Sequence, residues 1–423
     1  MEWQAWLAGI LFLVVYGMII WDKYHRTPIA LVGAAVLLLA GVLNQEQALG
    51  FIDFNTIGLL TGMMIIVGIM RQSGVFEYLS IKAAKKAGGD PIKILIFLAI
   101  ITALASALLD NVTTVLLIVP VTFAICSRLD VTPIPFLIAE IFASNIGGTS
   151  TLIGDPPNIM IGSATGLGMM DFIVNLAPVI VVILAVTIAL LVLIYRKSLV
   201  VEDANRERIY EFNENEMITD MVLLKKSLLV MTFVIIGFFL HQVVHLESAT
   251  IAMAGAGILL LISGVDTEEV METVEWTTLF FFIGLFILVG GLVQVGIIEA
   301  VAVKIIELTQ GNLTLTAMLI LWFSAIASAF VDNIPFVATF IPLIKDIGTL
   351  GGMPVDNLWW ALSLGACLGG NGTLIGASAN VIVSGLAGRH GHPISFAGYM
   401  KVAMPLMLVS IVISMIYLLL FYF

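Results

Sequence analysis

The chain contains two copies of one apolar sequence pattern. The run ASALLDNVTTVLLIVP at 105–120 returns as ASAFVDNIPFVATFIP at 327–342, an offset of 222 positions with no gap. The same offset carries TLIG at 151–154 onto TLIG at 373–376. A fixed offset over so long a stretch indicates an internal duplication. We therefore expect one structural unit to be built twice.

The composition places both units in a lipid bilayer. Hydrophobic residues make up 60% of the 423 residues and charged residues 11%, and the mean hydropathy is +1.12. A bilayer is crossed by about 20 apolar residues in a helix. Together these features predict an all-α polytopic membrane protein. Apolar runs of suitable length lie at 3–21, 28–43, 55–70, 172–195, 227–246, 249–264, 277–295 and 396–422.

One region of each copy is too long for a single crossing. Residues 92–126 are apolar throughout, and as one helix they would measure roughly 50 Å against a hydrocarbon core of about 30 Å. Asp110 and Asn111 stand at their centre. We predict a re-entrant helical hairpin with its tip near 110–114. Its counterpart is 313–349, with the tip DNIP at 332–335.

A second region of each copy breaks a helix. The stretch IGGTSTLIGDPPN at 146–158 combines paired glycines with two prolines, and both residue types disfavour a continuous helix. Its counterpart LGGNGTLIGASAN at 368–380 keeps the glycines. Irregular backbone at membrane depth is tolerated where it is buried or lines a cavity. The sequence therefore predicts a broken transmembrane helix in each copy.

Counted from the span at 55–70, which is itself included, five full crossings precede its copy at 277–295, so the second copy should be upside down. We predict two inverted-topology repeats, at 1–195 and 227–423, joined by a cytoplasmic linker at 196–226. With the N-terminus outside, all Lys and Arg except Lys304 and Lys345 fall on the cytoplasmic side, as the positive-inside rule requires. The purely acidic segment 265–276 also falls inside and is the exception.

Inverted repeats of this kind place a transport site at the bilayer midplane, between discontinuous helices. Four acids are expected at that depth: Asp110, Glu140, Asp155 and Asp332. We expect no Lys or Arg beside them, which favours a cation or a neutral polar solute over a multiply charged anion. The candidate solute-binding residues are Asn111, Thr113, Thr149, Asn158, Asn333, Thr373 and Asn380.

Each of these residues also has a structural interpretation. Asp110 and Asp332 would serve as N-caps of the second limbs of their hairpins. Glu140 has no acidic counterpart, since Leu362 stands at its repeat position; this suits either a single proton carrier or a satisfied buried acid. The Asn and Thr residues at the breaks can serve as helix-end hydrogen-bonding groups alone. The sequence leaves these alternatives open.

The strings SALLDNVTTVLLIVPVTFAI and AEIFASNIGGTSTLIGDPPNIMIGSATGL carry a family resemblance. They resemble the group of arsenite efflux permeases (ArsB-type), NhaD-type sodium/proton antiporters and the melanosomal P protein, within the ion transporter superfamily. The carboxylate carriers of that superfamily have tips that look like Ser-Asn-Thr, and here an acid replaces the serine. The resemblance implies an elevator-like motion against a scaffold and a homodimer.

From these features we predict a secondary transporter in the inner (plasma) membrane that exports arsenite or antimonite in exchange for protons. Asp110, Asp332, Glu140 and Asp155 would carry the protons. An NhaD-type Na⁺/H⁺ antiporter is the first alternative, and a carboxylate or other anion carrier is less favoured. We expect no enzyme activity, no metal, no cofactor beyond the proton motive force or Na⁺, and no nucleic acid. A soluble arsenite-stimulated ATPase is a candidate partner.

Overall fold

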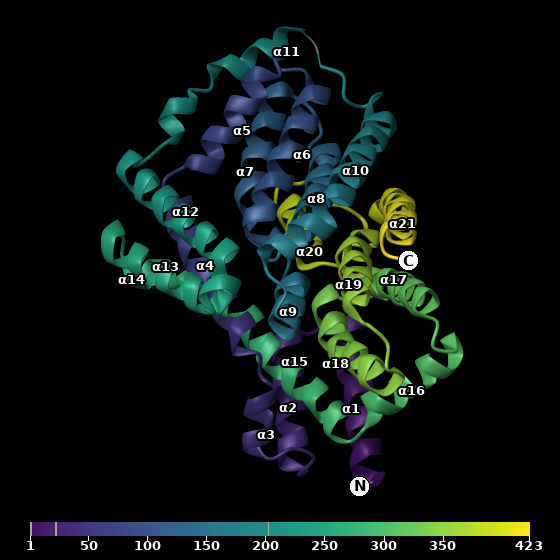
Figure 1. Ribbon diagram of the computed structural model, residues 1–423. Coiled ribbons are helices and arrows are strands. Elements are labelled where there is room, and N and C mark those ends of the chain that lie inside the picture. Colours follow the sequence, from purple (N-terminus) through teal and green to yellow (C-terminus); the bar gives the residue numbers. More distant parts are fainter. Residues whose placement is uncertain (1, 22, 202) are drawn as a thin grey trace.

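The computed structural model describes residues 2–21, 23–201 and 203–423, and within these ranges the chain is helical without strands (Figure 1). Ten of the described helices are long and apolar enough to cross a membrane. The predicted fold class is confirmed. The ten helices are α1 (Glu2–Trp21), α4 (Phe54–Arg71), α6 (Pro91–Leu108), α7 (Asn111–Leu129), α10 (Met169–Tyr195), α12 (Met221–Val244), α15 (Trp276–Gln294), α17 (Leu313–Phe330), α18 (Asn333–Gly351) and α21 (Phe396–Phe421).

Shorter helices complete each half. Those that matter for the site are α2 (Arg26–Leu39), α8 (Ile134–Thr149), α9 (Pro156–Thr165), α13 (Ser248–Ser263), α19 (Asp356–Gly369) and α20 (Ser378–Arg389). The connecting helices are α3 (Gln45–Phe51), α5 (Val75–Lys86), α11 (Asp203–Glu207), η1 (Arg208–Glu211), η2 (Glu214–Met217), α14 (Thr267–Glu272), α16 (Ile297–Thr309) and η3 (Gly370–Gly372).

The two halves repeat one helix order with opposite orientation. Helices α4, α6, α7 and α8 begin 222 positions before α15, α17, α18 and α19 respectively. In each half two helices form a hairpin (α6–α7 and α17–α18), and an interrupted helix follows (α8–α9 and α19–α20). Each half therefore contains the predicted re-entrant hairpin and broken helix.

Glycines allow the hairpins and broken helices to pack backbone against backbone. A Cβ on Gly147 of α8 would lie 2.2 Å from the carbonyl oxygen of Ala103 in α6. At the repeat-related position, a Cβ on Gly369 of α19 would lie 2.5 Å from the carbonyl oxygen of Ala325 in α17. No side chain fits at these distances. The paired glycines therefore fix the first limb of each hairpin to its broken helix.

The helices form two groups. One group, which we call the frame, consists of α1–α4 and α12–α15, where α4 packs on α13 and α2 on α15 (left and lower part of Figure 1). The other, the core, consists of the hairpins and broken helices. The two halves interlock in the core, since α7 packs on α20 and α18 on α9. Residues of both hairpin tips line one small cavity.

The segment between α10 and α12 leaves the helical bundle. It contains α11, η1 and η2, and it is bound to the first half by two ion pairs. Arg128 Nη1 of α7 lies 2.8 Å from Glu211 Oε2, and Lys85 of α5 pairs with Glu214. The division of the chain at 1–195, 196–226 and 227–423 stays a prediction.

Candidate functional site

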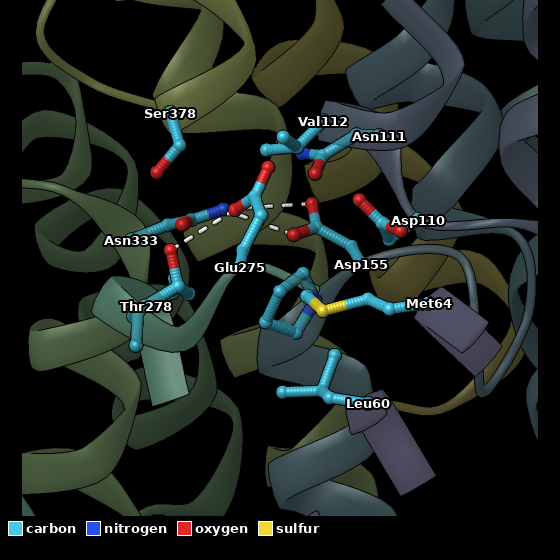
Figure 2. A pocket seen from close by; sticks show the side chains of 12 residues that line it. Leu60, Met64, Asp110, Asn111, Val112, Asp155, Glu275, Thr278, Asn333 and Ser378 are labelled. Atoms are coloured by element: carbon cyan, nitrogen blue, oxygen red, sulfur yellow. Dashed lines mark hydrogen bonds between the residues drawn. The ribbon is translucent and has the colours of Figure 1, made fainter. Parts of the chain in front are cut away.

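A small cavity lies where the two hairpin tips meet the first helix break (Figure 2). Its volume is about 20 Å³, which is room for about one water molecule. Its polar lining comes from both halves and consists of Asp110, Asn111, Asp155, Glu275, Thr278, Asn333 and Ser378. We call it the central cavity. Among the described residues that line it there is no Lys or Arg.

At the first tip, Asp110 is the N-cap of α7. Its Oδ1 accepts a hydrogen bond of 2.8 Å from the Thr113 backbone N–H, and its Oδ2 accepts one from the Thr113 hydroxyl. Both bonds stay inside the hairpin, and the residue is 7% exposed. Thr113 therefore binds Asp110, and it is absent from the cavity lining.

At the second tip, Asp332 is the N-cap of α18 and has partners outside its hairpin. Its Oδ1 accepts from the Ile334 backbone N–H at 3.1 Å, and its Oδ2 accepts from the Ser378 hydroxyl at 3.0 Å. The same oxygen forms an ion pair with Arg26 at the start of α2. The capping interpretation therefore holds for both aspartates, but their surroundings differ.

The ion pair corrects the expectation that no base lies beside the acids. Arg26 was expected at the cytoplasmic surface; in the structure its side chain is 22% exposed, and the guanidinium carbon lies 4.8 Å from the centre of the Phe281 ring. The physical reason is the length of α2. Its 14 residues span about 21 Å, less than the hydrocarbon thickness, so both ends cannot reach a surface.

Two further carboxylates face the cavity. Asp155, fully buried before α9, lies opposite the Asn333 amide, whose Nδ2 is 3.3 and 3.4 Å from its two oxygens (Figure 2). Glu275, half-buried before α15, accepts a 3.0 Å hydrogen bond from Thr278 Oγ1. Glu275 is not among the acids that the sequence predicts at the site. It lies in the acidic segment 265–276 that broke the positive-inside rule, and that anomaly was the available signal.

A buried amide cluster joins the two halves behind the cavity. Asn145 of α8 accepts a 3.0 Å hydrogen bond from Asn111 at the first tip. Its own amide nitrogen donates to Asn371 at 3.0 Å and to Asn380 at 2.9 Å. All four side chains are at most 3% exposed. The cluster connects the first tip to the second helix break.

The predicted solute ligands at the breaks are used for structure here. The Asn158 amide donates to the carbonyls of Thr149 and Thr151, at 3.0 and 2.8 Å. The Asn380 amide does the same for Gly370 and Thr373, at 2.8 and 2.9 Å. Each amide thus satisfies carbonyl groups that the interrupted helix leaves free.

The two break threonines also bond to backbone. Thr149 Oγ1 donates to the Asn145 carbonyl at 2.7 Å, and Thr373 Oγ1 donates to the Ala329 carbonyl. None of Thr149, Asn158, Thr373 and Asn380 lines the central cavity. Their contact with a solute stays a prediction.

Glu140 lies apart from the other acids. It is fully buried in α8 and accepts a hydrogen bond from Thr122 of α7 through Oε1. Its Oε2 has no hydrogen-bond partner among the described residues. The structure therefore does not bring Glu140 to the central cavity.

A wider chamber opens beside the central cavity. It has a volume of about 420 Å³ and shares Glu275, Thr278 and Ser378 with the central cavity. We call it the vestibule. Its other polar lining residues include His25, Arg26, Thr277 and Asp332. The vestibule therefore adjoins the central cavity, and its lining includes the exposed His25.

A much smaller cavity of about 70 Å³ lies at positions related to the vestibule by the repeat. We call it the closed-end cavity. The pairs of repeat-related lining residues are Ile19 and His241, His25 and Glu247, Arg26 and Ser248, Thr277 and Asn55, and Val381 and Ile159. The two cavities thus lie at repeat-related positions in the two halves, and one is wide and the other narrow.

Potential metal ligands and cysteines are also present in the described part of the chain. No group of three or more His, Cys, Asp or Glu residues there is arranged to hold a metal ion. Cys126 and Cys367 are free and buried.

The chain is similar to known membrane transporters over nearly its whole length. An uncharacterized transporter of Mycobacterium tuberculosis is 46% identical over 423 residues, covering 99% of this chain and 98% of the relative. The human P protein is 36% identical over 503 aligned positions, covering 99% of this chain and 60% of the P protein. The structure is similar to the YdaH transporter of Alcanivorax borkumensis, with a TM-score of 0.59, 14% identity and coverage of 98% and 97%.

The last likeness shows the fold alone, because the identity is low. The family is shown by a model described as a citrate transporter, which matches residues 16–365. The predicted relation to transporters that include the P protein is confirmed, whereas the predicted arsenite specificity has no support in these matches. The protein is thus a multi-pass membrane transporter that belongs to the CitMHS citrate transporter family of the ion transporter superfamily.

Proposed function

We propose that the chain is a secondary transporter that exchanges protons for a small solute without net negative charge. The observation that carries the proposal is the lining of the central cavity. Asp110, Asp155 and Glu275 face one water-sized space with amides and hydroxyls. Carboxylates at membrane depth are costly unless they are protonated or paired with a cation. Protons are the smallest cations that satisfy this requirement.

The solute would occupy the vestibule, because the central cavity is too small for more than a water-sized species. Glu275, Thr278 and Ser378 offer hydrogen-bond donors and acceptors where the vestibule adjoins the carboxylates. Arsenous and antimonous acids are uncharged trihydroxides near neutral pH and match such groups. Arsenite or antimonite export therefore remains our first candidate activity.

A carboxylate carrier is the second candidate. Arg26 lines the vestibule, and the matching family is described as a citrate transporter. A carboxylate would however have to compete for Arg26 with Asp332, which already pairs with it. The vestibule also contains Glu275. For these reasons we rank a free multivalent anion below a neutral solute.

Reconstitution into proteoliposomes distinguishes the candidates. We would impose a pH gradient, follow the internal pH with a trapped dye, and add arsenite, antimonite, Na⁺ or citrate in separate experiments. Proton movement upon addition of arsenite or antimonite is the expected result, and it should be lost in Asp155→Asn. A response to Na⁺ alone would favour the sodium/proton antiporter, and a response to citrate alone would overturn the proposal in favour of the carboxylate carrier.

We further propose that the linker 196–226 faces the cytoplasm of the cell and that the N-terminus lies outside. The concentration of Lys and Arg supports this orientation. Protease cleavage within the linker in inside-out vesicles, together with protection in intact cells, is the expected result. Cleavage in intact cells would reverse the topology.

A further inference from the structure

The vestibule and the closed-end cavity differ in exposure at repeat-related positions. Val381 lines the vestibule and is 46% exposed, whereas its repeat counterpart Ile159 lines the closed-end cavity and is 2% exposed. Since both positions come from the same place in the repeat, this difference reports the conformation. The protein stands open at the vestibule and closed at the other end.

The closed end is held by hydrogen bonds between frame and core. Ser163 of α9 donates to Asp53 Oδ1 at 2.8 Å and accepts from the Asn55 amide at 3.2 Å. The repeat counterpart of Ser163 is Gly385, which has no side chain. The vestibule end therefore cannot be closed by the same bonds.

The open end has a frame-to-core link of its own. Arg26 of α2 pairs with Asp332 at the second hairpin tip and lies against the ring of Phe281 in α15. The repeat counterparts of the pair are Ser248 and Asp110. In the described part of the chain no hydrogen bond joins those two residues. Ser248 lines the closed-end cavity and Asp110 lines the central cavity, whereas Arg26 and Asp332 both line the vestibule.

Inverted repeats can exchange conformations. In the opposite state the second half would adopt the arrangement that the first half has now. Arg26 and Asp332 would then be placed as Ser248 and Asp110 are placed here, without a bond between them. An interaction that exists in one of two states shifts the equilibrium toward that state.

We propose that Arg26 is a positioning residue: its ion pair with Asp332 fixes the second hairpin tip to the frame, and this contact keeps the vestibule open and the opposite end closed. Movement to the opposite state requires the pair to separate. A cation or proton that binds Asp332 competes with Arg26 and would release the tip. The inference rests on the two-state transporter of the proposed function, but not on its solute or coupling ion.

The test measures the two ends directly, without a transported solute. Cys126 and Cys367 are replaced by Ala, and a single cysteine is introduced as Val381→Cys or Ile159→Cys. An uncharged maleimide is used so that the changed charge at residue 26 does not itself alter the reagent's local concentration. With Arg26 present, we expect the cysteine at 381 to react at least tenfold faster than the cysteine at 159.

Arg26→Gln should lower the ratio of the two rates several-fold, with slower reaction at 381 and faster reaction at 159. Arg26→Lys, which keeps the positive charge and leaves Asp332 as the N-cap of α18, should restore the ratio. Lys85→Gln, which breaks the peripheral ion pair with Glu214, is the control and should leave the ratio unchanged. An unchanged ratio in Arg26→Gln, or equal acceleration at both positions through general loosening, would overturn the inference.

Discussion

The two hairpin tips carry the same Asp-Asn pair but use the aspartate differently. Asp110 bonds to Thr113 of its own hairpin and faces the central cavity. Asp332 bonds to Ser378 in a broken helix and to Arg26 in the frame. The carboxylate of Asp110 therefore faces the cavity without a basic partner, whereas the carboxylate of Asp332 is paired with the guanidinium of Arg26.

Three substitutions between the repeats account for the difference. Thr113 corresponds to Pro335, which has neither an N–H nor a hydroxyl to give to the aspartate. Conversely, Ser378 corresponds to Pro156, and Arg26 to Ser248. The two halves thus share the backbone arrangement and the glycine packing. They differ in a few side chains, and these determine where charge lies near each tip.

We expect the largest loss of stability at the glycine contacts that both halves share. Gly147→Ala and Gly369→Ala would each press a methyl group into a helix backbone, at 2.2 and 2.5 Å from a carbonyl oxygen. We expect each to destabilise the protein by roughly 3 kcal/mol, since the backbone of a packed helix cannot yield as a side chain can. Thermal unfolding in detergent would measure this. Gly385→Ala, with nothing within 4 Å of the added Cβ, is the control.

The second largest effect is a loss of transport when either tip aspartate is replaced. Asp110→Asn and Asp332→Asn should each reduce proton-driven flux at least tenfold, because one removes a cavity carboxylate and the other the partner of Arg26. Flux in proteoliposomes is the measurement. Normal flux in both variants would remove the tip aspartates from the coupling mechanism.

The same two variants should differ in stability. Asn caps a helix about as well as Asp, so Asp110→Asn should change the free energy of unfolding by less than about 0.5 kcal/mol. Asp332→Asn leaves the mostly buried Arg26 without its acid and should cost roughly 2 kcal/mol. The loss of unfolding free energy caused by Asp332→Asn should be smaller when Arg26→Gln is also present. Unfolding midpoints of the single and double variants would measure this difference. Equal penalties for the two tips would contradict the difference between them.

The smallest effect concerns an ion pair outside the membrane. The hydrogen bond from Lys85 lowers the pKa of Glu214 below its usual value. The stabilisation is therefore present at neutral pH and is lost as the pH falls through the lowered pKa. Both side chains lie in connecting segments and remain in part accessible to water, with exposed fractions of 20% and 26%, and a pair screened by water contributes little. Lys85→Gln should therefore barely shift the unfolding temperature at pH 7, and less still at pH 3. A shift as large as that of Asp332→Asn would mean that the deeper burial of Asp332 (8% exposed, against 26% for Glu214) does not distinguish the two pairs.

Much of the architecture follows from local sequence. The offset of 222 residues, the overlong apolar run at 92–126 and the Gly-Gly and Pro-Pro interruptions predict the hairpins and broken helices that the structure contains. Asp110, Asn111, Asp155 and Asn333 were also predicted, and the structure brings them to one cavity. These features rely on backbone preferences and on hydrophobic length, which act within a segment and are therefore visible in sequence.

Which side chains face each other was decided by tertiary structure. Asn158 and Asn380 satisfy backbone carbonyls, Glu140 lies apart, and Arg26 and Glu275 enter the site from segments expected at a membrane surface. The short helix α2 and the interlocking of one half's hairpins with the other half's breaks set these contacts. Sequence determined that buried acids would lie between two inverted repeats, but depth and pairing depend on how helices distant in the chain pack, which no local pattern encodes.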